Sequence, residues 1–165
     1  MKEIPLTQGK FAIVDDADFE WLNRRKWFAR FCKGHWYAYS GHSQILMHRL
    51  IMNCPKGKEI DHWNNNGLDN RRANIRECSH SQNMANKPGR SKISKYKGLV
   101  YHKLAHKWRA RIRCNYRCFH LGLFDSEINA AKAYDKKAKE LFGEFAYLNF
   151  PTKIASSTNI STVPL

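Results

Sequence analysis

The sequence predicts an α+β protein with two small structural parts. Residues 58–87 follow the order strand, loop, strand, helix, and residues 96–151 follow the order of three strands and one helix. Residues 88–95 between them are polar, basic and broken by Pro and Gly, as in a linker. The length of 165 residues alone allows one domain or two. We expect a first part at 1–87, the linker, a second part at 96–151 and a disordered Ser/Thr-rich tail at 152–165.

Composition indicates a polyanionic partner. The formal net charge is +15 and the isoelectric point is near 9.8, and such an excess of cations repels itself unless a partner neutralises it. Nucleic acid and an anionic membrane would both serve. However, no apolar run approaches about 18 residues, and residues 1–10 lack the hydrophobic segment of a targeting peptide. A soluble cytoplasmic protein with a nucleic-acid partner is therefore expected.

Cysteine usage excludes two kinds of scaffold. The cysteines are odd in number and show no CxxC spacing, so neither a disulfide framework nor a zinc ribbon is indicated. We interpret them as reduced packing thiols, and they are Cys32, Cys54, Cys78, Cys114 and Cys118.

Short strands and helices alternate before the central stretch. The expected elements are a strand at 11–14, a helix at 18–27, aromatic-rich strands at 27–31 and 35–39 joined by a turn at 32–34, and a helix at 44–53. His48 falls in the last of these helices. It either packs in the core or contacts phosphate.

Polar residues in the central stretch fall at the ends of predicted elements. Asp61 and His62 close a short strand, and the Asn-rich run that follows forms a turn or loop. Residues 75–78 are strand-like. Ser79-His80-Ser81-Gln82 then matches a capping box, which predicts a helix from Ser79 to the Pro-Gly pair at 88–89. Asn83 therefore lies in the first turn of that helix.

These residue types suit phosphodiester cleavage. The reaction needs a base to activate water and a cation to stabilise the developing charge. His62 titrates near neutral pH and can accept the proton, while Asp61 and Asn83 offer oxygen ligands to a hard cation. Asn74 could fix the His62 ring by a hydrogen bond. His80, one residue into the helix, is a spare candidate ligand.

At these residues the sequence resembles a known family. The segments IDH, GLDNRRANIR and SQNMAN resemble the HNH nuclease motif, in the phage and intron homing-endonuclease branch where Asn replaces the last His. Upstream, LTQGKFAIVDDADFEWLNRRKW and LMHRLI are similar to phage HNH proteins. The resemblance implies a ββα-metal fold with His62 as general base, Asp61 and Asn83 binding one divalent ion, and Asn74 positioning His62. It also implies Mg²⁺ or Mn²⁺ as cofactor, a phage-encoded protein in a bacterial host, and cleavage that leaves 5′-phosphate and 3′-hydroxyl ends. One metal site predicts that a monomer, the favoured state, nicks one strand, whereas a double-strand break needs two protomers or two events.

Cations dominate the second part. Residues 92–118 hold nine Lys or Arg and no Asp or Glu. Strands are expected at 98–101, 107–113 and 116–121, and the middle strand alternates so that Trp108 faces one side and its cations the other. Ser126 caps a helix through Phe142 whose buried stripe is Ala131, Tyr134, Ala138 and Leu141.

We predict that the free cations contact double-stranded DNA. Arg71 and Arg72 are either a solvated charge pair or phosphate clamps, and the basic context favours clamps. The predicted contacts are Arg71, Arg72, Lys97, Lys107, Arg109, Arg111, Arg113 and Arg117.

The second part resembles a plant DNA-binding domain. KGLVYHKLAHKWRARIR, LGLFDSEINAAKAYDKKAKELFG and AYLNFP resemble the ethylene-response-factor (Apetala-two) domain across residues 94–151. That resemblance implies a sheet that reads DNA with Arg and Trp and a helix packed behind it, although Trp108 by alternation faces the helix here. The two resemblances together predict a homing-type DNA endonuclease. The alternatives are a non-enzymatic DNA-binding regulator on an HNH-like scaffold and an RNA-binding module. The RNA-binding module fits the charge, but this sequence lacks the aromatic stacking pair on an exposed sheet face that such modules use.

Overall fold

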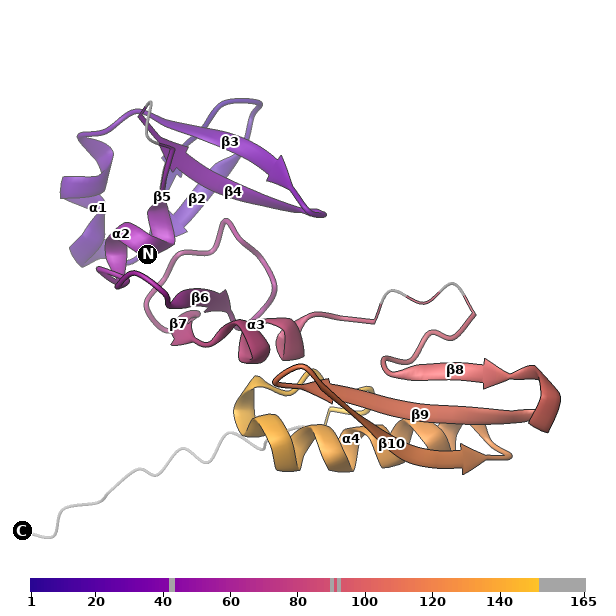
Figure 1. The fold of residues 1–165 in the computed structure, drawn as a ribbon. Coiled ribbons are helices and arrows are strands. Elements are labelled where there is room, and N and C mark those ends of the chain that lie inside the picture. Colours follow the sequence, from indigo (N-terminus) through magenta and orange to yellow (C-terminus); the bar gives the residue numbers. More distant parts are fainter. Residues whose placement is uncertain (42–43, 90, 92, 152–165) are drawn as a thin grey trace, which may run out of the picture.

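The chain folds into two units that meet at one short helix (Figure 1). The computed structural model describes residues 1–41, 44–89, 91 and 93–151. The predicted tail at 152–165 lies outside these residues, as do positions 90 and 92 of the predicted linker. Small antiparallel sheets and helices build both units, so the α+β class is confirmed. Within the described ranges, no helix is long and apolar enough to cross a membrane.

The N-terminal unit consists of short elements around one core. Its elements are β1 (Lys2–Pro5), β2 (Phe11–Val14), α1 (Asp16–Asn23), β3 (Trp27–Cys32), β4 (His35–Ser40), β5 (Ile45–Leu46) and α2 (Met47–Ile51). The predicted strand at 11–14 and the aromatic hairpin are confirmed. Strand β1 was not predicted; it pairs with β2, and Ile4, Ala12 and Val14 enter the core.

The helix predicted at 44–53 is shorter than expected. Ile45 and Leu46 pair with Ser40 and Tyr39 of β4 as a third strand, so their backbone groups are committed to the sheet. The helix α2 begins only at Met47 and ends at Ile51.

A strand-loop-strand-helix unit follows, as predicted. It comprises β6 (Glu59–His62), β7 (Ile75–Cys78) and α3 (His80–Asn86). Both hydrogen bonds of the Ser79–Gln82 capping box are present. The long loop between the strands is tied to β2, because Ile13 N donates to Leu68 O at 2.8 Å and Asn70 N donates to Ile13 O at 2.8 Å. At Gly67 a Cβ atom would lie 2.6 Å from the Tyr37 ring, so only glycine lets the loop approach β4 this closely.

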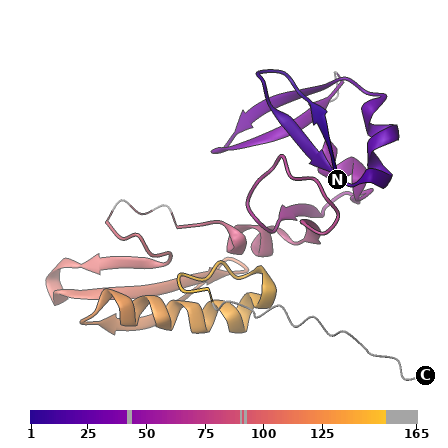
Figure 2. The same ribbon diagram turned by 180° about the vertical axis from the view of Figure 1, so that it is seen from behind.

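The C-terminal unit is a three-stranded sheet with one helix behind it. Its elements are β8 (Leu99–His102), η1 (Lys103–Ala105), β9 (Lys107–Cys114), β10 (Arg117–Phe124), α4 (Glu127–Phe142) and η2 (Gly143–Phe145), with β9 central. Figures 1 and 2 show α4 against one face of this sheet and the other face uncovered. The predicted stripe is confirmed at Ala131, Tyr134 and Ala138. Leu141 is only half-buried, and Phe142 is buried in its place. Ser126 is the N-cap residue but makes no side-chain cap bond.

Helix α3 joins the two units. Ala85 is buried in the C-terminal core, and its carbonyl accepts a hydrogen bond from Tyr147 N at 3.1 Å. Lys97 Nζ donates to the carbonyls of Met84 at 3.3 Å, Lys87 at 2.6 Å and Ala85, where a cation stabilises the end of the helix. The predicted DNA contact of Lys97 is corrected, because its ammonium is hydrogen-bonded to these backbone carbonyls. Burial, together with the neighbouring Lys87, lowers the pKa of Lys97 to about 8.

Candidate active site

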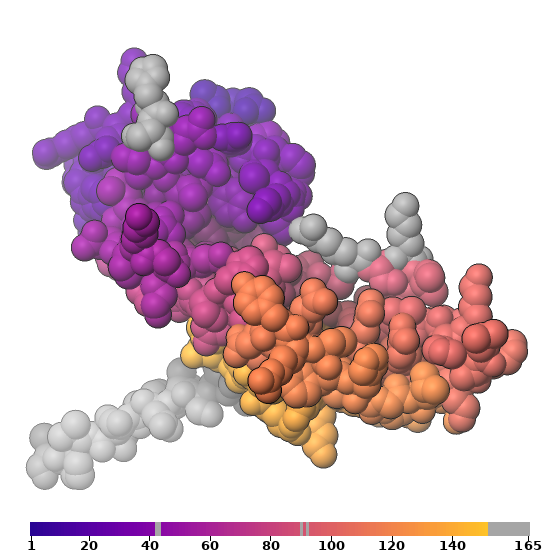
Figure 3. All heavy atoms as spheres, viewed as in Figure 1, coloured from indigo at the N-terminus to yellow at the C-terminus, as the bar shows by residue number. Residues whose placement is uncertain are grey.

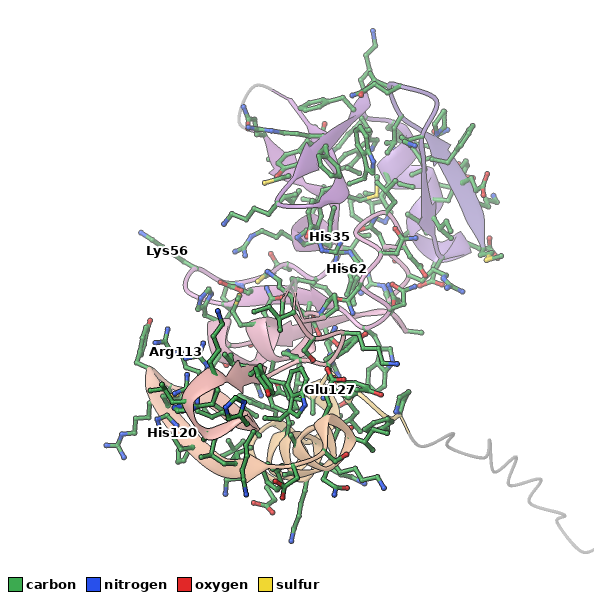
Figure 4. The ribbon with its side chains drawn as sticks, turned by 90° about the vertical axis from the view of Figure 1, so that its right-hand side faces the viewer. His35, Lys56, His62, Arg113, His120 and Glu127 are labelled. Carbon is green, nitrogen blue, oxygen red and sulfur yellow. The ribbon has the colours of Figure 1, made fainter. Side chains whose placement is uncertain are left out.

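Asp61 and His62 lie on opposite faces of β6. Successive strand residues point to opposite sides, so Asp61 faces α3 and His62 faces the N-terminal unit. Their exposed fractions are only 4% and 6%. Figure 4 shows His62 in the interior of the molecule, close to His35 of β4. The two predicted reactive groups are therefore adjacent in sequence but sit in separate surroundings.

The Asp61 carboxylate is held by a cation and an amide. Arg76, its cross-strand partner on β7, donates to Oδ2 from Nε at 3.0 Å and from Nη2 at 2.9 Å. The Asn86 side-chain amide of α3 lies 3.0 and 3.1 Å from the two carboxylate oxygens. The same amide donates to the His62 carbonyl at 2.9 Å, so Asn86 holds both the Asp61 carboxylate and the backbone of His62.

Arg76 also reaches the C-terminal unit. Its guanidinium lies 4.4 Å from the Trp63 ring centroid and 3.8 Å from that of Phe145. Nη1 donates to the Glu144 carbonyl at 3.2 Å and lies 3.3 Å from its carboxylate. One guanidinium thus connects the candidate metal ligand Asp61 to η2, and the sequence patterns did not indicate this connection.

Asn83 lies in the first turn of α3, as predicted, but its side chain contacts Glu59 rather than Asp61. Its side-chain amide donates to Glu59 Oε2 at 2.6 Å. His80 Nδ1 lies 2.8 Å from the other oxygen of Glu59. Partial burial raises the pKa of Glu59, but the hydrogen bonds from His80 and Asn83 outweigh it and lower that pKa below its usual value. Two acid–amide pairs, Asp61–Asn86 and Glu59–Asn83, therefore stand side by side between β6 and α3.

The His62 ring packs in an aromatic cluster. It meets the His48 ring edge-on at 4.9 Å between centroids and an angle of 88°, and the Tyr37 ring at 6.0 Å. Burial lowers the pKa of His62, against the opposing effects of its Asn70 hydrogen bond and the Asp61 charge. Burial and the neighbouring His62 lower the pKa of His48 to about 3. Both imidazoles are therefore neutral at pH 7, and a neutral imidazole can accept a proton.

This geometry also decides between the two readings of His48. The ring is 6% exposed and lies within the core of the N-terminal unit. It is a packed histidine here and not a surface phosphate contact.

Asn70, rather than Asn74, lies beside the His62 ring. Asn70 Oδ1 is 3.4 Å from His62 Nε2. Asn74 uses its side chain within the loop, accepting from Asn64 N at 3.0 Å and donating to the Asp69 carbonyl at 2.8 Å. The predicted hydrogen bond from Asn74 to His62 is therefore wrong for this structure. Asn74 shapes the loop that carries Asn70.

Arg71 and Arg72 form ion pairs. Arg71 Nε and Nη2 lie 2.7 and 2.6 Å from the two oxygens of Asp69, and Arg72 Nε and Nη2 each lie 2.8 Å from Asp18. Both carboxylates are almost fully buried. The preference for phosphate clamps is corrected, because these guanidinium groups brace the loop against buried acids.

The polar groups between β6 and α3 fit the chemistry of one hard divalent ion. Asp61 and Glu59 offer carboxylate oxygens, whereas Asn83 and Asn86 direct their amide N–H groups at these carboxylates and would have to turn over to offer oxygens. Mg²⁺ is commonly held by one or two carboxylates, with waters and phosphate oxygens completing the shell. No group of three His, Cys, Asp or Glu gathers into a metal cluster anywhere in the described ranges. A single ion on Asp61 would have to compete with Arg76 for Oδ2.

The uncovered face of the C-terminal sheet carries a row of arginines. Arg109, Arg111 and Arg113 alternate with the buried Ala110 and Ile112 along β9. Across the part of the chain that the structure describes, none of the three has an acidic partner. Figure 3 shows β9 and β10 side chains projecting from this face, and Figure 4 shows Arg113 and His120 on the same side of the molecule as Lys56 of the N-terminal unit.

Two predicted DNA contacts differ from this row. Lys107 Nζ forms an ion pair with Asp125 at 3.2 Å. Arg117 pairs with Cys114 across the hairpin, which puts it on the face of Phe119 and Ile112 rather than that of Arg113. Trp108 lies against the helix-side core, as predicted.

Comparison with known proteins supports part of this assignment. A family model described as HNH endonuclease matches residues 47–85. An uncharacterised HNH endonuclease of Acanthamoeba polyphaga mimivirus is 29% identical over 149 residues, which cover 86% of this chain and 76% of that protein. APETALA2-like protein 2 from Oryza sativa subsp. indica, and likewise from subsp. japonica, is 37% identical over 73 residues, or 43% of this chain. The chain spans only 16% of the length of these rice relatives. No solved structure matches the chain significantly. These similarities support an HNH-type nuclease domain over residues 47–85, the segment that contains Asp61 and His62.

Proposed function

We propose that the protein is a homing-type DNA endonuclease that hydrolyses phosphodiester bonds with one divalent ion and a histidine base. The observation that carries the proposal is the sorting of Asp61 and His62 to opposite faces of β6. The carboxylate stands among the amides of α3, and the imidazole is kept neutral by burial. Both lie within the segment that matches the HNH endonuclease model.

In the proposed mechanism His62 acts as the general base. Its Nδ1, the ring nitrogen without a proton when Nε2–H donates to Asn70, accepts a proton from the water that attacks phosphorus. The bond to the 3′ oxygen breaks and this oxygen takes a proton from solvent, leaving a 5′-phosphate and a 3′-hydroxyl. Asn70 Oδ1, 3.4 Å from Nε2, accepts the Nε2–H hydrogen bond and so favours the tautomer in which Nδ1 is the base. Asn74 contributes to catalysis indirectly, by holding the loop that carries Asn70.

Oxygen ligands for the ion come from β6 and α3. Asp61 is the proposed carboxylate ligand, and the amide ligand is Asn83 by motif or Asn86 by proximity. A bound Mg²⁺ or Mn²⁺ supplies positive charge that stabilises the developing phosphorane and the leaving oxygen. With one such site per chain, a monomer cuts one strand, and a double-strand break needs two protomers or two events.

The C-terminal unit is the proposed DNA-docking domain. In this division, residues 1–87 form the nuclease part, 88–95 the linker and 96–151 an Apetala-two type domain. Support comes from the partial similarity to the rice proteins and from the unpaired arginines on the uncovered sheet face, which are free to meet phosphates or guanine edges. Arg109, Arg111 and Arg113 are the contacts that we retain from the predicted set.

Plasmid cleavage tests the proposal. Supercoiled plasmid carrying the native locus is incubated with the protein and Mg²⁺, and we expect nicked circles with the wild-type protein and none with His62→Ala or with excess chelator. The matched control is His106→Asn, because His106 is remote from the site and has a left-handed backbone (φ 51°) that Asn tolerates. Cleavage by His62→Ala at the wild-type rate would remove His62 from the role of base. Cleavage in excess chelator would exclude the metal mechanism.

A second candidate function is a DNA-binding protein without catalysis. The buried Asp61–Arg76 ion pair favours it, since this pair closes the carboxylate in the absence of an ion. This function predicts duplex binding by the wild-type protein with no cleavage in either Mg²⁺ or Mn²⁺.

A further inference from the structure

A groove separates α3 from the open end of the C-terminal sheet. Strand β8 is shorter than β9, and the last bond on their shared edge runs from Arg111 N to Gly98 O at 2.9 Å. Beyond it the edge of β9 turns toward α3, and Asn115 N donates to Ser81 Oγ at 3.3 Å. Figure 1 shows this end of β9 next to α3. The groove between them has a volume of about 710 Å³.

The lining of the groove combines apolar surface with positive charge. Ile112, Phe142 and Met84 contribute apolar surface, and the Met84 side chain is 48% exposed. Arg111, Arg113 and Lys97 contribute the cations, and the Lys97 ammonium is already bonded to backbone carbonyls of α3 and Lys87. The lining contains no Asp or Glu. A ligand with a flat apolar part and a negative charge, such as a nucleotide, matches this lining.

Tyr116 stands in the lining in an unusual conformation. It is 94% exposed at the turn between β9 and β10. Asn115 and Tyr116 have φ values of 47° and 64°, as in the tight hairpin turns that favour Asn followed by Gly. Asn suits its position, but a bulky side chain at the second position is strained. Neither packing nor turn chemistry accounts for an exposed tyrosine here, and residues held in such conformations cluster at ligand sites.

We propose that this groove binds an unpaired nucleotide of the DNA substrate, with its base stacked on the Tyr116 ring and its phosphate on Arg113. The proposal rests on the proposed DNA function but not on catalysis. It also places that nucleotide near the candidate active site, because Ser81 and Met84 of α3 line the groove while Asn83 and Asn86 of the same helix face β6. A base released from the duplex beside the cut would enter the groove.

Oligonucleotide binding without divalent ions tests the proposal, since cleavage is then absent. Fluorescence anisotropy measures the affinity for a short single strand, with wild-type protein, Tyr116→Gly and Tyr116→Phe. Base–aromatic stacking contributes about 1–3 kcal/mol per base, so we expect Tyr116→Gly to bind about 5- to 160-fold more weakly and Tyr116→Phe to bind normally. Glycine relieves the strained turn, so the unfolding temperature of Tyr116→Gly should equal or exceed that of the wild type. Weaker binding by a variant that is at least as stable cannot come from misfolding.

The matched control is Leu104→Ala. Leu104 is an equally exposed apolar residue at 92%, but it lies in η1 and does not line the groove. Unchanged binding by Tyr116→Gly, or an equal loss in Leu104→Ala, would overturn the proposal. Tighter Tyr116-dependent binding to RNA of the same sequence would overturn the assignment to DNA. Plasmid nicking is scored separately, so cleavage without single-strand binding rejects the groove alone.

Discussion

Replacing Arg76 with methionine tests whether Asp61 is a metal ligand. Removing the guanidinium leaves a carboxylate that is 4% exposed with only an amide beside it. Breaking a buried ion pair from one side costs about 3–5 kcal/mol. In a chain of this size 1 kcal/mol shifts the unfolding midpoint by about 2–4 °C, so the midpoint should fall by about 10 °C. Methionine is chosen because it can retain apolar contact with the rings of Trp63 and Phe145.

A divalent ion should reverse this loss. In Arg76→Met the Asp61 carboxylate is uncompensated, so Mg²⁺ no longer competes with a guanidinium. An ion at about 100 times its dissociation constant stabilises the folded state by about 2.7 kcal/mol. Calorimetric scans over a Mg²⁺ series should therefore show a rise of about 5–10 °C in the variant and a smaller rise in the wild type.

Arg72→Met is the matched control for this experiment. Arg72 makes the same two-pronged contact with Asp18, a carboxylate whose side chain is 5% exposed. The neighbouring Asp15 carboxylate accepts from the Arg72 backbone N–H at 2.7 Å, a bond that methionine retains. Its unfolding midpoint should fall without recovery in Mg²⁺. Equal recovery in both variants, or none in Arg76→Met, would refute Asp61 as the ligand.

Three further predictions concern the histidine pair, the loop and the sheet. The pKa of His48 is about 3 in the folded protein against an ordinary 6.5, so the unfolded chain binds a proton first as the pH falls. The contribution of His48 to stability is therefore complete above pH 6.5 and falls by up to about 5 kcal/mol as the pH drops toward 3. Denaturant titrations at a series of pH values should show a smaller loss in His48→Gln. Asn74→Ala should lower the unfolding free energy by about 2 kcal/mol through two lost loop hydrogen bonds, whereas Asn70→Ala should lower the cleavage rate by more than its effect on stability explains. Alanine at Arg109, Arg111 and Arg113 should reduce the slope of log affinity against log salt by about 0.9 for each lost phosphate contact; an unchanged slope would mean that the sheet does not lie on DNA.

Local signals were sufficient for most of the fold. The Ser79 capping box, the aromatic hairpin and the alternation along β9 each involve neighbours in sequence, and each element formed as predicted. Strand β1 was missed because KEIP, with Lys2 and Pro5, has little strand character, and its stability depends on pairing with β2. The start of α2 was misplaced for the same reason, since pairing with β4 outweighed the helical pattern at Ile45.

The surroundings of the candidate site residues follow only in part from local sequence signals. Strand alternation places Asp61 and His62 on opposite faces of β6. Choosing Asn70 over Asn74 requires the path of the loop, and that path depends on backbone bonds to Ile13 in a distant strand. The neighbours of Asp61 on α3 likewise depend on how the helix packs on β6, which the capping box does not determine.

Net charge alone overstates the number of cations available to a DNA partner. Of the predicted contacts, Arg71 and Arg72 neutralise buried carboxylates, and Lys97 neutralises the end of α3. A carboxylate that becomes buried on folding is stabilised by pairing with a cation, and that cation is then unavailable to phosphate. The arginine row on β9 stays available to phosphate because no acid is buried against it. We therefore expect the sheet face and the groove beside α3 to contribute most of the DNA affinity. Arg76 neither pairs only with a buried acid nor lies on the open sheet face. Its guanidinium contacts Asp61 on one side and Glu144 and Phe145 on the other, so a structural change in the C-terminal unit can alter the position of the proposed metal ligand through one side chain.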